Sequence, residues 1–207
     1  LFGRIDLSRM QNGLKKALNF RILPHGPAQS RAGMEYVLET KDSTSTSVLV
    51  PFIFSTTQTY QLEFGNTYMR IHTDGGTVLE TTQAITSATT AAPGVFTKVA
   101  HGLVTGDWVY WSDVVGLSQL DGRFMKVVRL SADTFSLLAL DGTPFSTIGL
   151  GLFASGNAAR VYEITTPYTS ADLAALHFTQ SNDVMTLVHP SYQQRELARL
   201  GLTRSEE

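Results

Sequence analysis

Cysteine is absent from this chain of 207 residues. Its absence excludes disulfide bonds, thiolate zinc sites and cysteine nucleophiles, so any chemistry must use other side chains. Charged residues make up only 16% of the chain and the net charge is -2, which argues against a nucleic-acid binder with a dense basic surface. Hydrophobic residues reach 43%, enough to build a core, and this composition excludes intrinsic disorder.

Long apolar runs are absent as well. The longest, residues 48–54, is interrupted by Pro51 and falls short of the roughly 20 residues that a membrane-spanning helix needs. We therefore expect no membrane segment. The chain starts at Leu1 with no initiator methionine and no signal-peptide pattern, so we interpret it as a piece of a longer protein.

Charge is distributed unevenly along the chain. Residues 1–41 carry seven basic and three acidic side chains, whereas the remainder carries nine basic and fifteen acidic ones. Apolar residues at helical spacing predict an amphipathic helix over residues 7–18. Its Arg9, Lys15 and Lys16 are candidate docking residues for an acidic partner, and the alternative is a solvated basic face.

Most of the chain has the pattern of β-structure. Segments in which apolar and polar residues alternate, separated by Gly, Asn and Asp turn signals, predict strands at residues 48–54, 60–64, 68–72, 77–80, 95–99, 108–111, 123–129, 134–139, 158–165 and 184–189. Capping-box patterns at Thr169 with Asp172 and at Ser191 with Gln194 predict two helices, the second running over residues 192–200. The predicted fold class is mainly β with a few short helices (α+β).

Two stretches interrupt the strand pattern: residues 81–93, rich in Thr, Ala and Ser, and the glycine-rich residues 149–157. The strands between them have the short, even spacing of a small barrel. Residues 82–160 also carry five basic and five acidic side chains, so this section is neutral. We predict a discontinuous outer β-domain, residues 1–81 and 161–207, with residues 82–160 inserted as a small β-barrel.

Motifs for catalysis or metal binding are missing from the sequence. The five histidines show no short metal-ligand spacing, and there is no G-x-S-x-G elbow, P-loop or dinucleotide fingerprint. Asp107 with Asp113, or Asp121 with Asp133, could form the carboxylate pair of a hydrolase, but each is more simply a turn residue. We predict no enzymatic activity, no catalytic residues, no metal and no cofactor.

Three aromatic residues crowd one predicted strand of the insert: Trp108, Tyr110 and Trp111. Alternation places Trp108 and Tyr110 on one face and Trp111 on the other. As an exposed cluster they are a candidate ligand surface for a receptor or glycan, and the alternative is that they fill the core of the barrel.

Three segments near the C-terminus form an ordered set: residues 166–173 (TPYTSADL), 178–184 (FTQSNDV) and 187–192 (LVHPSY). The set resembles the tail nozzle (tail tubular protein B) family of short-tailed phages and related prophage proteins. Its motif residues are Thr166, Pro167, Tyr168, Asp172, Leu173, Gln180, Ser181, Asp183, His189 and Pro190. The resemblance gives them a structural role.

Upstream segments match the same family: residues 19–33, 52–55 and 60–65. The resemblance thus covers residues 3–80 and 160–200. One departure is the sequence Arg31-Ala32-Gly33-Met34, where the family has an Arg-Pro-Gly-Thr turn.

The insert has a resemblance of its own, carried by residues 101–109, Gly116, residues 121–122 and residues 133–135. These resemble the small β-barrel first described as the first catalytic-cysteine half-domain of ubiquitin-activating enzymes, a module that also occurs in phage tail proteins. The module itself has no catalytic cysteine, so ubiquitin chemistry is not implied.

Together the resemblances imply a structural protein of the virion tail, made in the bacterial host cytoplasm. Identical subunits would form a ring, sixfold in the family, that binds a tail adaptor protein and passes phage DNA through the tail tube. The net charge of -2 is consistent with this role, because a wall that neutralised phosphates would hold the DNA by counterion release. The alternative function is a receptor- or glycan-binding tail module that uses the inserted barrel.

Overall fold

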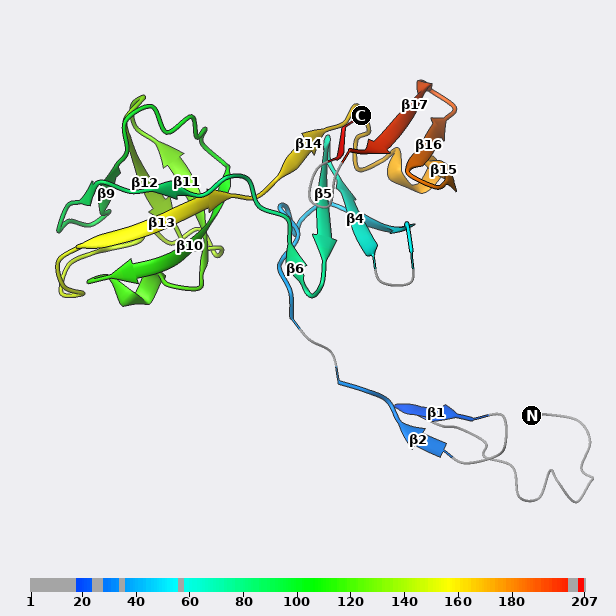
Figure 1. The fold of residues 1–207 in the computed structure, drawn as a ribbon, viewed down its shortest axis with the longest axis horizontal. Helices are drawn as coiled ribbons and strands as arrows, with labels where there is room; N and C mark the ends of the chain where they lie inside the picture. The colour runs from blue at the N-terminus through cyan, green and yellow to red at the C-terminus, as the bar shows by residue number, and fades with distance from the viewer. Residues whose placement is uncertain (1–17, 24–27, 34–35, 56–57, 201–204, 207) are drawn as a thin grey trace, which may run out of the picture. The chain divides into compact units, whose positions relative to one another are not determined.

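The computed structural model describes residues 18–23, 28–33, 36–55, 58–200 and 205–206 (Figure 1). These residues form a mainly β structure of antiparallel sheets, as the sequence predicts. The only helical elements in the described ranges are two short 3-10 turns. The chain divides into two compact units, residues 1–36 and 37–207.

The first unit contains a two-stranded hairpin of β1 (Phe20–Ile22) and β2 (Ala28–Ser30). The strands are antiparallel, and the Arg31 amide extends the ladder by donating to the Asn19 carbonyl at 2.8 Å. The predicted helix over residues 7–18 lies almost entirely outside the described residues.

The second unit begins with a β-meander that builds a five-stranded sheet in the order β14-β5-β4-β3, with β6 paired to β5. Its strands are β3 (Val48–Ile53), β4 (Thr59–Gly65), β5 (Tyr68–Thr73), β6 (Gly76–Thr77) and β14 (Glu163–Thr165). The predicted strands at residues 48–54, 60–64 and 68–72 are thus confirmed. Tight turns at Asn66 and at residues 74–75 set the register of the meander.

A four-stranded sheet follows, in the order β15-β16-β17-β18. Its strands are β15 (His177–Ser181), β16 (Val184–His189), β17 (Tyr192–Arg199) and β18 (Ser205–Glu206), preceded by the 3-10 turn η2 (Leu173–Ala175). This sheet shares one hydrophobic core with the five-stranded sheet. The core holds Val50, Phe52, Leu62, Phe64, Met69, Ile71, Val78, Tyr168, Leu173, Met185, Leu187 and Leu197.

The predicted C-terminal helix over residues 192–200 is wrong, because residues 192–199 form β17. Residues of high helix propensity are held in strand geometry by ladders to β16 and β18, so tertiary pairing overrides propensity. The other predicted helix is reduced to η2. Thr169 does donate from its amide and hydroxyl to the Asp172 carboxylate at 2.9 and 2.7 Å, but a single 3-10 turn follows this bond.

Residues 83–160 supply every strand of a seven-stranded sheet in the order β7-β13-β10-β11-β12-β9-β8. Its elements are β7 (Gln83–Ala84), β8 (Ser87–Ala88), β9 (Val95–Thr97), β10 (Trp108–Val115), η1 (Ser118–Leu120), β11 (Phe124–Arg129), β12 (Thr134–Leu138) and β13 (Ser155–Arg160). The adjacent short strands β7 and β8 pair with β13 and β9, so residues 83–88 join the two ends of the sheet and close it as a barrel.

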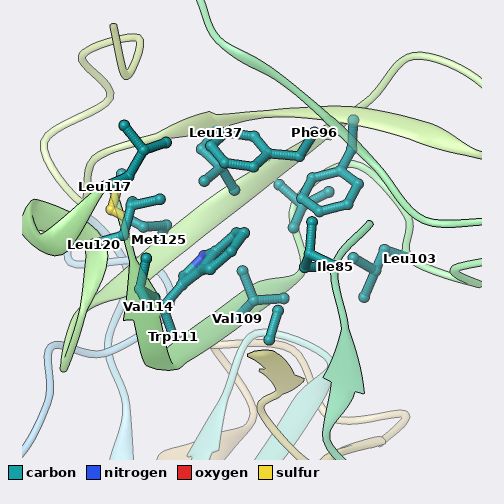
Figure 2. Packing of buried hydrophobic residues seen from close by; sticks show 13 residues of the cluster. Ile85, Phe96, Leu103, Val109, Trp111, Val114, Leu117, Leu120, Met125 and Leu137 are labelled. Atoms are coloured by element: carbon teal, nitrogen blue, oxygen red, sulfur yellow. The ribbon is translucent and has the colours of Figure 1, made fainter. Parts of the chain in front are cut away.

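The barrel has its own hydrophobic core (Figure 2). Trp111 lies at its centre, fully buried, with its ring 5.0 Å from that of Phe96. The core also holds Ile85, Leu103, Val109, Val114, Leu117, Leu120, Met125, Val127, Phe135, Leu137 and Ala158. The stretch 149–157 is not wholly a boundary, because β13 begins at Ser155 and pairs along β10. Independent folding of residues 82–160 stays a prediction.

Candidate functional site

A cleft of about 630 Å³ lies on the face of the five-stranded sheet that is turned away from the shared core. Strand alternation produces it: Leu49 and Ile53 line the cleft, whereas Val50 and Phe52 between them are buried in the core. Val37, Leu38, Thr40 and the β5–β6 turn also line it. Leu49 and Ile53 are each 60% exposed, so the cleft presents an apolar stripe on the edge strand β3.

A hydrogen-bonded group of polar side chains lies beside this stripe. Glu63 is buried, accepts a hydrogen bond from the Tyr68 hydroxyl at 2.7 Å, and lies 3.0 Å from Nε2 of His72. The other ring nitrogen of His72 lies 2.8 Å from the Thr77 hydroxyl. The order carboxylate, imidazole, hydroxyl is therefore held by three adjacent strands.

The pKa values in this group shift in opposite directions. Burial would raise the pKa of Glu63, but hydrogen bonds from His72 and Tyr68 and the charge of Arg70 outweigh it and hold the pKa below its ordinary value. Burial raises the pKa of Tyr68, and its bond to the Glu63 carboxylate raises it further. Glu63 is therefore an anion at neutral pH, and its depressed basicity makes it a weak proton acceptor.

Arg70 lies on the same face of the sheet as Glu63 and His72 and is almost fully buried, with 1% exposure. Its Nε donates to Glu163 at 3.2 Å, and Glu163 also pairs with the Lys41 ammonium. Cζ of Arg70 lies 4.5 Å from the centroid of the Trp108 ring on β10. Arg70 thus links the charged side chains of the five-stranded sheet to Trp108, the first residue of β10 in the barrel.

The two chain segments that lead into and out of the barrel are paired. Leu79 and Val161 form an antiparallel bridge, with bonds from Glu80 N to Arg160 O at 2.7 Å and from Tyr162 N to Val78 O at 2.9 Å. Arg160 adds ion pairs to Glu80 at 2.8 Å and to Asp107 at 3.4 Å. This pairing fixes the base of the insertion.

The residues of the phage-tail resemblance gather around the buried ring of Tyr168. That ring is 5.3 Å from the ring of Tyr192 and 6.2 Å from that of His189. The Tyr192 hydroxyl donates to Asp172 at 2.8 Å, which closes the group. The pKa of Asp172 lies below its ordinary value because Thr169 and Tyr192 donate hydrogen bonds to it.

Backbone bonds tie this segment to the meander. Thr166 N donates to the Thr67 carbonyl at 3.0 Å, and Thr67 N donates to the Tyr168 carbonyl at 2.8 Å. Thr166 and Leu173 are buried, Pro167 is half-buried, and Ser181 and Pro190 are exposed.

Two further motif residues bind other strands. The Gln180 side chain accepts from Ile53 N at 3.0 Å and donates to Ile53 O at 2.8 Å, as a neighbouring strand would. Asp183 accepts from Nε of Arg199 at 3.1 Å across the four-stranded sheet. Gln180 therefore joins the second part of the outer region to the first, whereas Asp183 makes its contact within the second part.

The other candidate residues are the three docking residues and the aromatic cluster of the insert. Arg9, Lys15 and Lys16 lie outside the described residues. Trp108 and Trp111 are 2% and 0% exposed, which corrects the reading of the aromatic cluster as an exposed ligand surface. Trp111 fills the barrel core, whereas Trp108 faces Arg70 and Tyr110 packs 4.9 Å from Phe124.

The turn residues of the insert bond to backbone as expected. His101 Nδ1 accepts from Leu103 N at 2.9 Å, and Asp107 accepts from Val104 N at 2.8 Å. Asp121 accepts from Val114 N at 3.1 Å, and Asp133 accepts from Ala100 N at 2.8 Å. These contacts give a structural role to four of the residues that carry the barrel resemblance.

Sequence reasoning missed the charged row, the connected polar side chains of Glu63, Tyr68, Arg70, His72 and Glu163. The signal was present, since a hairpin turned at Asn66 places alternate residues of both strands on one face. Glu163 joins the row only through the pairing of β14 with β5, which spans the whole insert and leaves no local pattern.

No group of three or more His, Cys, Asp or Glu side chains in the described part of the chain is placed to hold a metal ion. Among the same residues, no helix has the length and apolarity to cross a membrane. In comparisons with known proteins, no family model and no curated protein sequence matches this chain.

Proposed function

We propose that this chain is a structural subunit of a phage tail, located in the virion and assembled as a ring through which DNA passes. The proposal starts from the resemblance to the tail nozzle family. One observation supports it most: the motif residues serve as joints between β-elements, around Tyr168 and at the pair of Gln180 with Ile53. Such contacts suit a subunit that transmits load between sheets.

The chemistry of the cleft also favours a structural role over hydrolysis. Glu63 is held by Tyr68 and His72, and its depressed pKa makes it a poor general base at neutral pH. We expect no turnover of peptidoglycan, capsule or nucleotide substrates. Hydrolysis that disappears on mutating a single Asp or Glu would contradict this expectation.

Electron microscopy of the full-length protein tests the proposal directly. Negative-stain images should show closed rings, with six subunits if the family symmetry holds, and mass photometry should give the matching mass. The rings should also bind a tail adaptor protein. A full-length protein that stays monomeric at all concentrations, with or without the adaptor, would refute the proposed function.

A further inference from the structure

Strand β15 forms an outer edge of the four-stranded sheet, and four of its five residues are exposed. It contains no proline and no Asp, Glu, Lys or Arg, although proteins commonly protect an edge strand with such residues or with a covering element. The edge strand β3 has this protection, because Pro51 lacks an N–H group and the Gln180 side chain bonds to both backbone groups of Ile53. Strand β15 has none of it among the described residues, so it offers a surface for strand pairing.

The backbone groups on this edge belong to Phe178 and Gln180. Neighbouring residues of an antiparallel strand turn their N–H and C=O groups to opposite sides. Asp183 O accepts from Arg199 N on β17, so the next residue along β16 faces β15 and its partner there, Ser181. Alternation from Ser181 then turns the groups of Gln180 and Phe178 to the outer edge. No described residue bonds to these backbone groups, so their donors and acceptors are open to a partner strand.

We propose that β15 of one copy of the chain pairs antiparallel with β15 of a second copy, around a twofold axis at Thr179. In this register Phe178 of each copy lies opposite Gln180 of the other. These are the two residues whose backbone groups face the edge, so every exposed donor there meets an acceptor.

The side chains of β15 complement themselves in the same register. Thr179 lies opposite its own copy, and threonine pairs across strands are favourable. Phe178, which is 44% exposed, lies diagonally across the axis from its copy, at the roughly 7–8 Å spacing that aromatic side chains span. No like charges are opposed, because the strand carries no Asp, Glu, Lys or Arg. A second copy thus satisfies both the backbone groups and the exposed ring.

Cysteine crosslinking tests the register, because the chain has no cysteine of its own. T179C places a thiol opposite its copy in a non-hydrogen-bonded pair, where the Cα atoms lie about 4.5 Å apart, within the range of a disulfide. The matched control is S181C, another small exposed residue of β15, whose two copies would lie roughly 14 Å apart along the strands.

Each 207-residue variant is oxidised mildly, and its disulfide-linked dimer is quantified by mass spectrometry. Pairing raises the local thiol concentration, so the T179C dimer should form at least about tenfold faster than the S181C dimer. Circular dichroism verifies the fold of both variants. Equal rates would overturn the proposal.

A charge on the axis gives a second measurement. T179K places two ammonium groups directly opposite each other, which is destabilising, whereas the lysine of S181K lies away from the axis. Sedimentation equilibrium should show a concentration-dependent dimer whose Kd rises at least about tenfold in T179K and changes little in S181K. A chain that stays monomeric at every concentration would overturn the proposal, and so would a dimer that T179K leaves intact.

This contact goes beyond the proposed ring. A twofold contact closes between two subunits and does not repeat around a ring, so in a ring-forming protein it would join two rings. Rings in which T179C crosslinks no faster than S181C would refute the β15 contact alone. Rapid T179C crosslinking in a protein that never closes into rings would refute the ring and leave the contact intact.

Discussion

Cζ of Arg70 on β5 lies 4.5 Å from the centroid of the Trp108 ring on β10, so a buried cation of one sheet rests on an aromatic ring of the other. Two hydrophobic cores lie on either side of this contact and share no residue. The Arg70 guanidinium thus makes a polar contact between the two cores.

Removing the charge should weaken this contact measurably. Arg70→Met deletes the bond to Glu163, and we expect a loss of about 2 kcal/mol of unfolding free energy, because hydrogen bonds to charged groups contribute about 1.5–3 kcal/mol. A double-mutant cycle with Trp108→Leu, followed by urea unfolding, should give a coupling of about 1 kcal/mol. Strict additivity of the two substitutions would show that the stacking contributes nothing.

Gly65 makes room for the Tyr68 ring. A Cβ on Gly65 would lie 2.2 Å from atoms of that buried ring, so Gly65→Ala must displace it and break its bond to Glu63. We expect a loss of about 2 kcal/mol in thermal or urea unfolding, in the range for a broken buried hydrogen bond. Gly33→Ala is the matched control, since a Cβ there meets no atom within 4 Å. Equal effects of the two substitutions would be inconsistent with this packing.

Stability should fall at both ends of the pH scale for separate reasons. The folded-state pKa of Glu63 is depressed, so its contribution is present above the ordinary value of 4.5 and is lost as pH falls through the folded value. The folded-state pKa of Tyr68 is raised, so its contribution is complete below 10.0 and is lost as pH rises above that value.

Unfolding free energies measured across the pH range test both arms. Glu63→Gln should flatten the acid arm, and Tyr68→Phe should flatten the alkaline arm, while each leaves the opposite arm less affected. Unchanged slopes in both variants would assign the pH dependence to other groups.

Gln180 should protect the edge of β3. Gln180→Ala removes both bonds to the Ile53 backbone, and we expect a loss of about 1 kcal/mol because the site is only partly buried. An unprotected edge strand also templates pairing with other chains, so the variant should aggregate faster on heating. Light scattering measures this, with Gln193→Ala on the exposed face of β17 as the control. Identical aggregation of the two variants would rule out edge protection.

Residues 82–160 should fold on their own. Their strands pair only with one another in the seven-stranded sheet, and their core is separate. The isolated segment should show a cooperative urea transition, and the chain in which a short Gly/Ser linker replaces it should stay folded. A segment without a cooperative transition would contradict the predicted domain organisation.

The sequence predicted the meander and most barrel strands because their alternation and their turns at Asn66 and residues 74–75 are local signals. It failed at β17, where the helix-favouring residues 192–199 are held by partners that no local pattern reveals. The short strands β7 and β8 escaped prediction because two residues carry no periodicity.

The same difference between local signals and long-range contacts applies to the candidate site. The motif residues near Tyr168 were found through the family resemblance, which covers three short segments between residues 166 and 192. The charged row was not, because Glu163 reaches Arg70 only after the chain has completed the whole insert. Burial of Trp108 depends on a similar long-range contact, so the sequence left its burial and its exposure open as alternatives.

The pairing of Leu79 with Val161 brings the two ends of the barrel segment together. The chain leaves the five-stranded sheet and returns to it at hydrogen-bonding distance, so another module could stand in this place only if its own ends lay equally close together. Such a module would also have to cover the guanidinium of Arg70, as the Trp108 ring does.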